Sequence, residues 1–320
     1  MSKPLFSLDK KRIWVAGHGG MLGRSLVRQL QSESGTIITA GRNELDLTDK
    51  ENTADFYLKN KPNVVIVAAA KSGGILAYRD KPASYLHENL AIEQNLIAGA
   101  AQHDVEKLIF VGSAAAYPEH AAQPFQPEAL MSGSLDKYHE SYGLAKIVGI
   151  RLCQFFRVEN DCDFISVLPT NFYGPHGNSD QYSGHVVPSL MQRFCQAYRD
   201  RAPSVTIWGT GLAKRQFLHV DDCAGAIIHV LKHYSGNDPI NIAPVGETSI
   251  AELAMIISKI VGYEGKLVQD SSKPDGAMRR ALDVQMLQSL GWKPKVSLRE
   301  GLQRLYHHIC MSETKPINSV

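Results

Sequence analysis

An apolar strand that ends in a glycine-rich turn constrains this chain more than any other segment. The turn contains three glycines spaced by three residues: Gly17, Gly20 and Gly23. It lies between the apolar stretch Arg12–Ala16 and the amphipathic stretch Met21–Gln31. A strand, a glycine turn and a helix in this order let backbone N–H groups approach a pyrophosphate at the positive end of the helix dipole. Glycine spacing alone would fit an unliganded turn, but this context favours a dinucleotide site.

The first half of the chain alternates apolar and amphipathic stretches. Further strands are expected at 36–40, 64–70, 108–112 and 164–168, and helices at 91–102, 187–199, 221–232 and 249–261. This rhythm predicts an α/β fold, a Rossmann-like doubly wound parallel sheet with a smaller α+β substrate-binding domain. We expect residues 1–174 plus 219–243 in the cofactor domain, 175–218 plus 244–312 in the substrate domain, and a frayed tail at 313–320.

Composition excludes several classes of function. The chain has 320 residues, 44% of them hydrophobic and 21% charged, and a net charge of +2, so neither nucleic acid nor a membrane surface is the expected partner. Five scattered cysteines without CxxC spacing indicate reduced thiols and a cytoplasmic location. The twelve histidines form no metal-ligand pattern, and no apolar run approaches the roughly 20 residues that span a bilayer.

The residues after the second expected strand indicate which dinucleotide binds. An acidic residue there would bind a ribose 2′-hydroxyl and select NAD. The sequence instead has Ala40-Gly41-Arg42, and Arg42 can pair with a 2′-phosphate, which favours NADP(H). The alternative for Arg42 is an ordinary solvated arginine. Asp46 and Leu47 are expected near the adenine.

A second group of residues, far downstream of the glycine turn, predicts which type of reaction the chain catalyses. Tyr142 and Lys146 lie one helical turn apart, and Ser113 follows the apolar strand 108–112. A tyrosine can transfer a proton at neutral pH when a neighbouring ammonium lowers the pKa of the phenol, and a serine hydroxyl can orient a carbonyl. Together with the dinucleotide turn, these three residues predict hydride transfer with a coupled proton transfer.

Several longer segments resemble one known family, the extended short-chain dehydrogenase/reductases that act on nucleotide sugars. Within that family the chain is similar to the GDP-L-fucose synthase branch over nearly its whole length. The segments that carry the resemblance are 17–21 (GHGGM), 68–75 (AAAKSGGI), 168–176 (LPTNFYGPH), 183–188 (SGHVVP), 216–222 (QFLHVDD) and 273–276 (KPDG).

The resemblance implies a reaction and a set of residue roles. The family inverts C3 and C5 of GDP-4-keto-6-deoxymannose with a cysteine and a histidine, and then reduces C4 with NADPH. By position, Ser113, Tyr142 and Lys146 are the reductase set, and His185 is the epimerase acid. Further residues implied at the cofactor or the sugar are Ala69, Asn171, Arg193, Trp208, Arg215 and Arg280. For His185, Arg193 and Trp208 the alternatives are a substrate-binding histidine, an exposed helix residue and a core side chain.

Two positions depart from the family. Ala115 stands where the epimerase cysteine belongs, and Gly19 where an arginine often binds the 2′-phosphate. Reduction is therefore expected and epimerisation is in doubt. Alternatives are a reductase for an already epimerised GDP-6-deoxy-hexose or -heptose, a C5-epimerase/4-reductase of the colitose type, and a non-catalytic NADP-binding sensor.

The resemblance also implies a homodimer. Members of the family pair through the helix that carries the tyrosine and lysine and through the helix before it. The residues expected at that interface are Ile147, Ile150, Leu152 and Phe155, with 91–101 and their small residues Ala98, Gly99 and Ala101.

Overall fold

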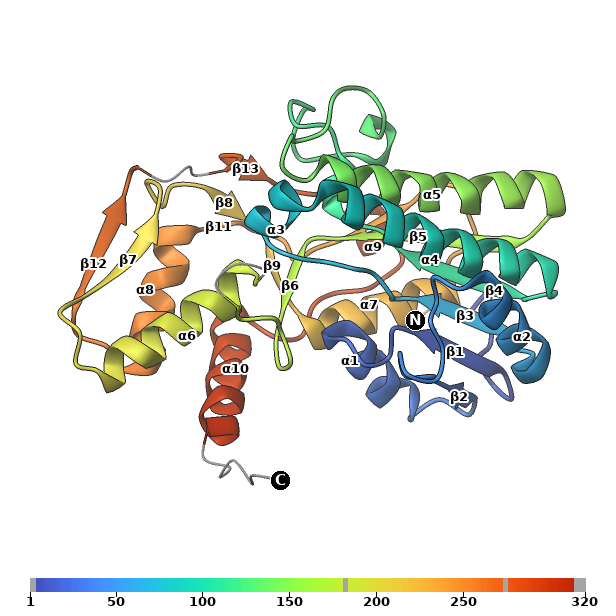
Figure 1. The fold of residues 1–320 in the computed structure, drawn as a ribbon, viewed down its shortest axis with the longest axis horizontal. Helices are drawn as coiled ribbons and strands as arrows, with labels where there is room; N and C mark the ends of the chain where they lie inside the picture. Colours follow the sequence, from blue (N-terminus) through green and yellow to red (C-terminus); the bar gives the residue numbers. More distant parts are fainter. Residues whose placement is uncertain (1–3, 181–183, 273–275, 314–320) are drawn as a thin grey trace.

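A six-stranded parallel sheet forms the centre of the molecule (Figure 1). The computed structural model describes residues 4–180, 184–272 and 276–313. The strand order is β10-β5-β4-β3-β1-β2. Their bounds are β1 Arg12–Ala16, β2 Thr36–Ile38, β3 Val64–Val67, β4 Lys107–Val111, β5 Asp163–Pro169 and β10 Ile240–Ile242. From β1 the chain goes first to β2 on one side and then to β3 on the other, so the strand order reverses beside β1.

Helices cover both faces of this sheet. One face packs on α1 (Met21–Leu30) and α7 (Val220–His233), and the other on α2 (Lys50–Asn60), α4 (Pro82–Gln102) and α5 (Glu140–Asn160). The side chains of β1 alternate between the two cores, Ile13 and Val15 on one side, Trp14 and Ala16 on the other. Because both faces are covered, the strands are apolar throughout, as expected for a parallel sheet. The fold class is therefore the expected Rossmann-like α/β class.

A third hydrophobic core lies beside the main sheet. It is formed around α6 (Val186–Arg199), α8 (Ile250–Val261) and α10 (Leu298–Glu313), with the parallel pair β7 (Ser204–Trp208) and β12 (Lys266–Asp270). Two small sheets connect the regions (Figure 1). One pairs β6 (Asn171–Tyr173) with β9 (Phe217–His219), and the other holds β8 (Lys214–Arg215) between β11 (Thr248–Ser249) and β13 (Arg279–Arg280).

Some element bounds differ from the expected ones. The strand expected at 64–70 ends at Val67, because the following residues leave the sheet to pass the glycine turn. The helix expected at 91–102 begins at Pro82, a residue well suited to a first helical turn. Helix α2 was not expected; Asp49 caps it, accepting a hydrogen bond from the Asn52 N–H at 3.0 Å. Helix α3 (Ile75–Asp80) and helix α9 (Gln285–Ser289) were also not expected.

Two residues expected at a dimer interface are used inside the fold. Ile150 is only 2% exposed and belongs to the core between α5 and the sheet. Gly99 faces α2, where an added Cβ would lie 2.7 Å from the Tyr57 ring. Phe155, also expected at that interface, is exposed, as are Leu144, Val148 and Val158 on the same helix.

Part of the sequence analysis falls outside the described ranges. This holds for residues 314–320 of the expected tail, and for residues 183 and 273–275 of the family-like segments. Within the described ranges, no helix combines the length and the apolarity needed to cross a bilayer.

Candidate functional site

The glycine turn leaves no room for side chains at two of its positions. Gly17 has φ +88°, and an added Cβ would lie 2.5 Å from the backbone nitrogen of Ala69. A Cβ on Gly23 would overlap the carbonyl oxygen of Gly17. The Gly20 N–H donates to that same oxygen at 3.1 Å. Backbone from β1, β3 and α1 therefore meets at the point where the strand order reverses, which is where ligands bind in such sheets.

The start of α1 fits the pyrophosphate of a dinucleotide. Its N-cap residue is Gly20, and no side chain caps its first turn. A helix start without a side-chain cap keeps N–H donors for an anion. The buried Nδ1 of His18 also has no hydrogen-bond partner among the described residues. Nothing lies within 4 Å of a Cβ added at Gly19, so this position, unlike Gly17 and Gly23, has room for a β-carbon.

Arg42 lies just beyond the end of β2 and is exposed. No described residue forms a recorded hydrogen bond with its guanidinium. Hydrogen bonds from Thr48 lower the pKa of Asp46, and the Arg42 charge lowers it further. Asn95 donates to the carbonyl oxygen of Leu47 at 3.0 Å and fixes this loop against α4. Arg42 is thus placed at the same edge of the sheet as the glycine turn, with its charge open to an anion.

A buried asparagine fixes the segment after β3. Asn89 on α4 accepts from the Lys71 N–H at 2.8 Å and donates to the Lys71 carbonyl at 2.9 Å. The Lys71 ammonium contacts Ser84 and Glu88 on the same helix. These contacts hold Ala69 beside Gly17, which explains why the segment leaves the sheet so early.

The reactive residues come together because α5 approaches the loop after β4 closely. Ser113 caps the short 3₁₀ turn η1 (Ala114–Ala116), its hydroxyl accepting from the Ala115 N–H at 3.1 Å. On α5, Gly143 faces this turn, and a Cβ there would lie 2.5 Å from the Ala115 carbonyl. Tyr142 precedes Gly143, so the turn with Ser113 and the helix with Tyr142 are neighbours.

The electrostatics around Tyr142 differ from the expectation. The Lys146 ammonium lies 5.4 Å from the centre of the Tyr142 ring, but it also lies 3.0 Å from a carboxylate oxygen of Glu93. Burial raises the pKa of Tyr142, and the negative charge of Glu93 raises it further. The expectation of a lowered pKa for this phenol is therefore wrong. Glu93, 53 residues before Lys146, was missed because no local pattern connects them.

Two arginines expected along the sugar cleft lie side by side. Arg215 and Arg280 are partners in the parallel pairing of β8 and β13. Arg280 Nη1 approaches the Ala114 carbonyl at 3.4 Å, next to Ser113, and its Nη2 is buried without a partner among the described residues. Burial and the Arg280 charge lower the pKa of Arg215 to about 10. Adjacent half-buried guanidiniums of this kind are suited to an anionic ligand.

His185 is the N-cap residue of α6 and makes no side-chain cap there. It remains accessible to solvent, although the surrounding protein and the nearby His139 lower its pKa. His139 Nδ1 lies 3.0 Å from Asp136, whose pKa falls to about 2 chiefly through this contact. The Asp136–His139 pair was missed by the sequence analysis. His139 is the N-cap residue of α5, three residues before Tyr142, and this spacing is the signal that could have revealed it.

The remaining expected residues lie on the elements around the third core. Arg193 donates from Nη1 to the Thr206 carbonyl at 2.8 Å, and its buried Nε has no partner among the described residues. Trp208, at the end of β7, is 48% exposed, so the alternative of a core side chain is wrong. Asn171 is exposed at the start of β6. Arg193, Trp208 and Asn171 are all expected at the sugar, but the structure records no contact between any two of them.

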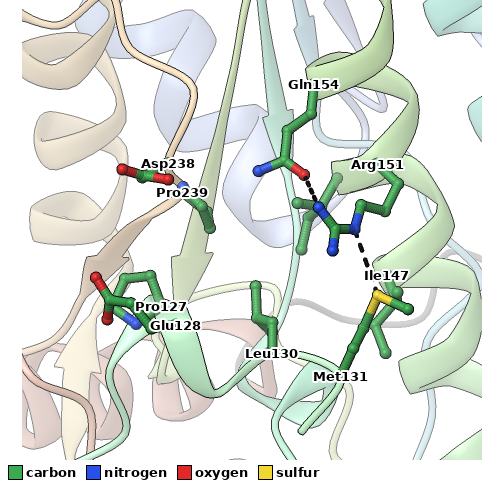
Figure 2. Close-up of a pocket in the computed structure, with 10 residues that line it drawn as sticks. Pro127, Glu128, Leu130, Met131, Ile147, Arg151, Gln154, Asp238 and Pro239 are labelled. Carbon is green, nitrogen blue, oxygen red and sulfur yellow. Dashed lines mark hydrogen bonds between the residues drawn. The ribbon is translucent and has the colours of Figure 1, made fainter.

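The hollow drawn in Figure 2 is separate from this site. It lies between α5 and the loop at 127–131, where Arg151 donates to Gln154 at 2.9 Å and to the Met131 sulfur at 3.3 Å. Its volume is ≈ 160 Å³, below the roughly 300–1,000 Å³ of ordinary ligand pockets. None of the residues expected at the cofactor or the sugar lines it.

Comparisons with known proteins agree with this geometry. Residues 13–243 match the model of the NAD dependent epimerase/dehydratase family. The chain is 48% identical over 303 residues to the GDP-L-fucose synthase of Sinorhizobium fredii, with 95% of this chain and 96% of the relative covered. The structure superposes on a GDP-6-OMe-4-keto-L-xylo-heptose reductase from C. jejuni with a TM-score of 0.89, at 31% identity, covering 96% of this chain and 99% of the other. It is also similar to the GDP-mannoheptose C4 reductase MlghC of Campylobacter jejuni with NADP bound (TM-score 0.85, 32% identity, 95% and 99% covered).

Proposed function

The chain belongs to the NAD-dependent epimerase/dehydratase family, and from that premise we propose that it is an NADPH-dependent 4-keto reductase of a GDP-4-keto-deoxy sugar. It is an oxidoreductase of the GDP-L-fucose synthase type, acting on a nucleotide sugar. The observation that supports the proposal is the close packing of α5, which carries Tyr142 and Lys146, against the turn that Ser113 caps, at the same edge of the sheet as the glycine turn.

Separate sets of residues would bind the cofactor and the GDP-sugar. Gly17, Gly20 and Gly23 would hold the pyrophosphate, and Arg42 the 2′-phosphate of NADP(H). When bound, the nicotinamide supplies the hydride. Arg215 and Arg280 are adjacent, with the charges of Asp136 and Glu119 near them, and would bind a diphosphate or the sugar hydroxyls.

Proton transfer is assigned to Tyr142. Ser113 orients the substrate carbonyl, and the Tyr142 Oη proton goes to the carbonyl oxygen as that oxygen becomes an alkoxide. Because burial raises the pKa of Tyr142, the phenol holds its proton at neutral pH and is ready to act as an acid. The test is to measure NADPH oxidation with an already epimerised 4-keto GDP-sugar. No oxidation with any 4-keto GDP-sugar tried would refute the assignment and favour the non-catalytic sensor.

Epimerisation is proposed to be weak at C3, C5 or both. Ala115 is 7% exposed and offers a methyl group where a base would be needed. Inversion requires one group to remove a proton and another to return one, and losing a general base costs about 10²–10⁴-fold in rate. Incubation with GDP-4-keto-6-deoxymannose in deuterated water without NADPH measures this directly. Ala115→Cys is expected to raise deuterium uptake, and family-typical conversion to GDP-L-fucose by the unmodified chain would refute the proposal.

A reductase for an already epimerised GDP-6-deoxy-hexose or -heptose is the second candidate. The observation that favours it is Ala115, together with the likeness to a protein described as a GDP-mannoheptose C4 reductase. Comparing kcat/KM for 4-keto hexose and heptose substrates separates the two candidates. A C5-epimerase/4-reductase of the colitose type would instead exchange deuterium at C5 alone.

The exposed apolar residues of α5 suggest the oligomeric state, and the cysteines suggest the cellular location. Leu144, Val148 and Phe155 expose an apolar face of α5, which suits a homodimer through α4 and α5. Sedimentation of a monomer at micromolar concentration would refute this. None of the five cysteines, all of which lie in the described residues, forms a disulfide, which suits the reducing cytoplasm.

A further inference from the structure

A buried ion pair lies next to Tyr142, the residue to which proton transfer is assigned. Lys146 on α5 and Glu93 on α4 are 1% and 0% exposed, and the ammonium lies 3.0 Å from Glu93 Oε1. Two aromatic rings enclose the ammonium, Phe110 at 4.8 Å and Tyr142 at 5.4 Å from their centres. Water is therefore kept from the pair, and each charge acts strongly on its neighbours.

Only one of the two Glu93 carboxylate oxygens has a hydrogen-bond partner among the described residues. Oε1 accepts from Lys146, while Oε2 is buried without a hydrogen-bond partner among the described residues. Burial raises the pKa of Glu93, and Lys146 opposes that change. A buried carboxylate oxygen without a partner destabilises the fold, and an apolar residue of the same size would avoid the cost. A role in stability alone therefore does not explain this residue.

The charge of Glu93 acts on Tyr142. Without a nearby carboxylate, an ammonium beside a phenol favours the phenolate. Here Glu93 offsets that effect, and the Tyr142 phenol keeps its proton. The other titratable groups around the pair are Cys153 on the same helix, Tyr78 stacked on Tyr142 at 5.3 Å, and, in contact with Tyr78, the ring of His139 with its partner Asp136.

We propose that Glu93 is a positioning residue of the reductase, which holds the Lys146 ammonium beneath Tyr142 and keeps the phenol protonated until the hydride arrives. The inference rests on the proposed reduction. In that step the hydride from the nicotinamide forms the new C–H bond at the carbonyl carbon, and the O–H bond of Tyr142 breaks to give its proton to the carbonyl oxygen. The ammonium then faces the phenolate that remains.

Glu93→Gln tests the proposal, because the amide keeps an oxygen for Lys146 but removes the charge. The expected result is that the alkaline limb of kcat for NADPH oxidation moves to lower pH by about one unit or more, with the sugar KM within about twofold. Glu106→Gln is the matched control, since Glu106 loses the same charge in a surface pair with Lys11. Glu93→Asp keeps the charge and is expected to leave the limb in place.

A second measurement does not depend on activity. The ultraviolet difference spectrum of the cofactor-free chain reports tyrosinate formation with pH, and the same spectrum with Tyr142→Phe added assigns the signal to this phenol. Glu93→Gln is expected to make Tyr142 ionise at lower pH.

An unchanged titration, or an unchanged kcat profile with only a lower Tm, would overturn the proposal. A wild-type chain that reduces no 4-keto GDP-sugar would refute the proposed function, while the titration would still decide the role of Glu93. Should Glu93→Gln not fold, Glu93→Asp with Lys146→Arg, titrated in the same way, is expected to keep a high Tyr142 pKa; a fall would overturn the proposal.

Discussion

The cofactor side of the proposed site is formed mainly by backbone atoms at positions without side chains, whereas its sugar side is formed by charged side chains. The cofactor side is formed by the turn at 17–23 and the adjacent segment at 69, where added Cβ atoms would meet main chain. The sugar side takes Arg215, Arg280 and His185 from three separate elements.

This difference predicts which side tolerates change. Backbone atoms of 17–18 and 68–69, directly after β1 and β3, oppose the added Cβ atoms, and they cannot move aside as a flexible side chain can. Half-buried or exposed side chains on short strands and at a helix start can be exchanged without moving the core. The cofactor side is therefore expected to lose binding or folding on small changes, and the sugar side to change its substrate preference.

Tyr142→Phe should have the largest effect, because this residue serves both sides at once. Turnover is expected to fall about 10²–10⁴-fold, since the phenol proton is needed only as the alkoxide forms. NADPH binding, measured by fluorescence titration, should stay nearly unchanged. Near-normal turnover would show that another group supplies the proton.

The cofactor side can be tested with two neighbouring glycines. Gly23→Ala places a methyl group on the carbonyl oxygen of Gly17, and overpacking of this kind costs about 1–3 kcal/mol. Both Tm and NADPH affinity should fall. Gly19→Ala is the matched control, because nothing lies within 4 Å of its added Cβ. If the two variants had the same Tm and the same NADPH affinity, close backbone packing would not explain why the turn needs glycine at position 23.

The sugar side can be tested with two neighbouring arginines. Arg280→Ala removes the guanidinium next to Ala114 and should raise the sugar KM with little change in NADPH binding. A charged hydrogen bond contributes about 1.5–3 kcal/mol, or roughly 10–100-fold. Arg279→Ala removes an exposed pair with Glu247 and should change little. If both variants bind the sugar equally well, Arg280 does not contact it.

Arg42→Ala should have the smallest effect of the four. The chain is expected to prefer NADPH over NADH, and loss of one charge-assisted contact with phosphate costs about 1.5 kcal/mol, or about tenfold in kcat/KM. NADH, which lacks the 2′-phosphate, serves as the internal control and should be used equally well by both proteins. Equal efficiency with the two cofactors in the unmodified chain would remove the basis for assigning Arg42.

The sequence by itself determined the α/β class and the main parts of the site. The glycine spacing at 17–23 and the one-turn separation of Tyr142 and Lys146 are local patterns, and local geometry follows from a few consecutive residues. Segment bounds were less accurate: α2 was missed because its apolar residues are few, and β3 was expected to be longer because Ala68 and Ala69 are apolar but leave the sheet.

Only the tertiary structure decided the charges around the reactive tyrosine. Lys146 implied a lowered pKa for Tyr142, whereas the packing of α4 against α5 places Glu93 beside that ammonium, and burial together with the Glu93 charge raises this pKa. The same holds for the approach of Arg280 to the turn after β4 and of His139 to His185. A pKa depends on every charge within several ångströms and on access to water, and both are set by residues far apart in the chain.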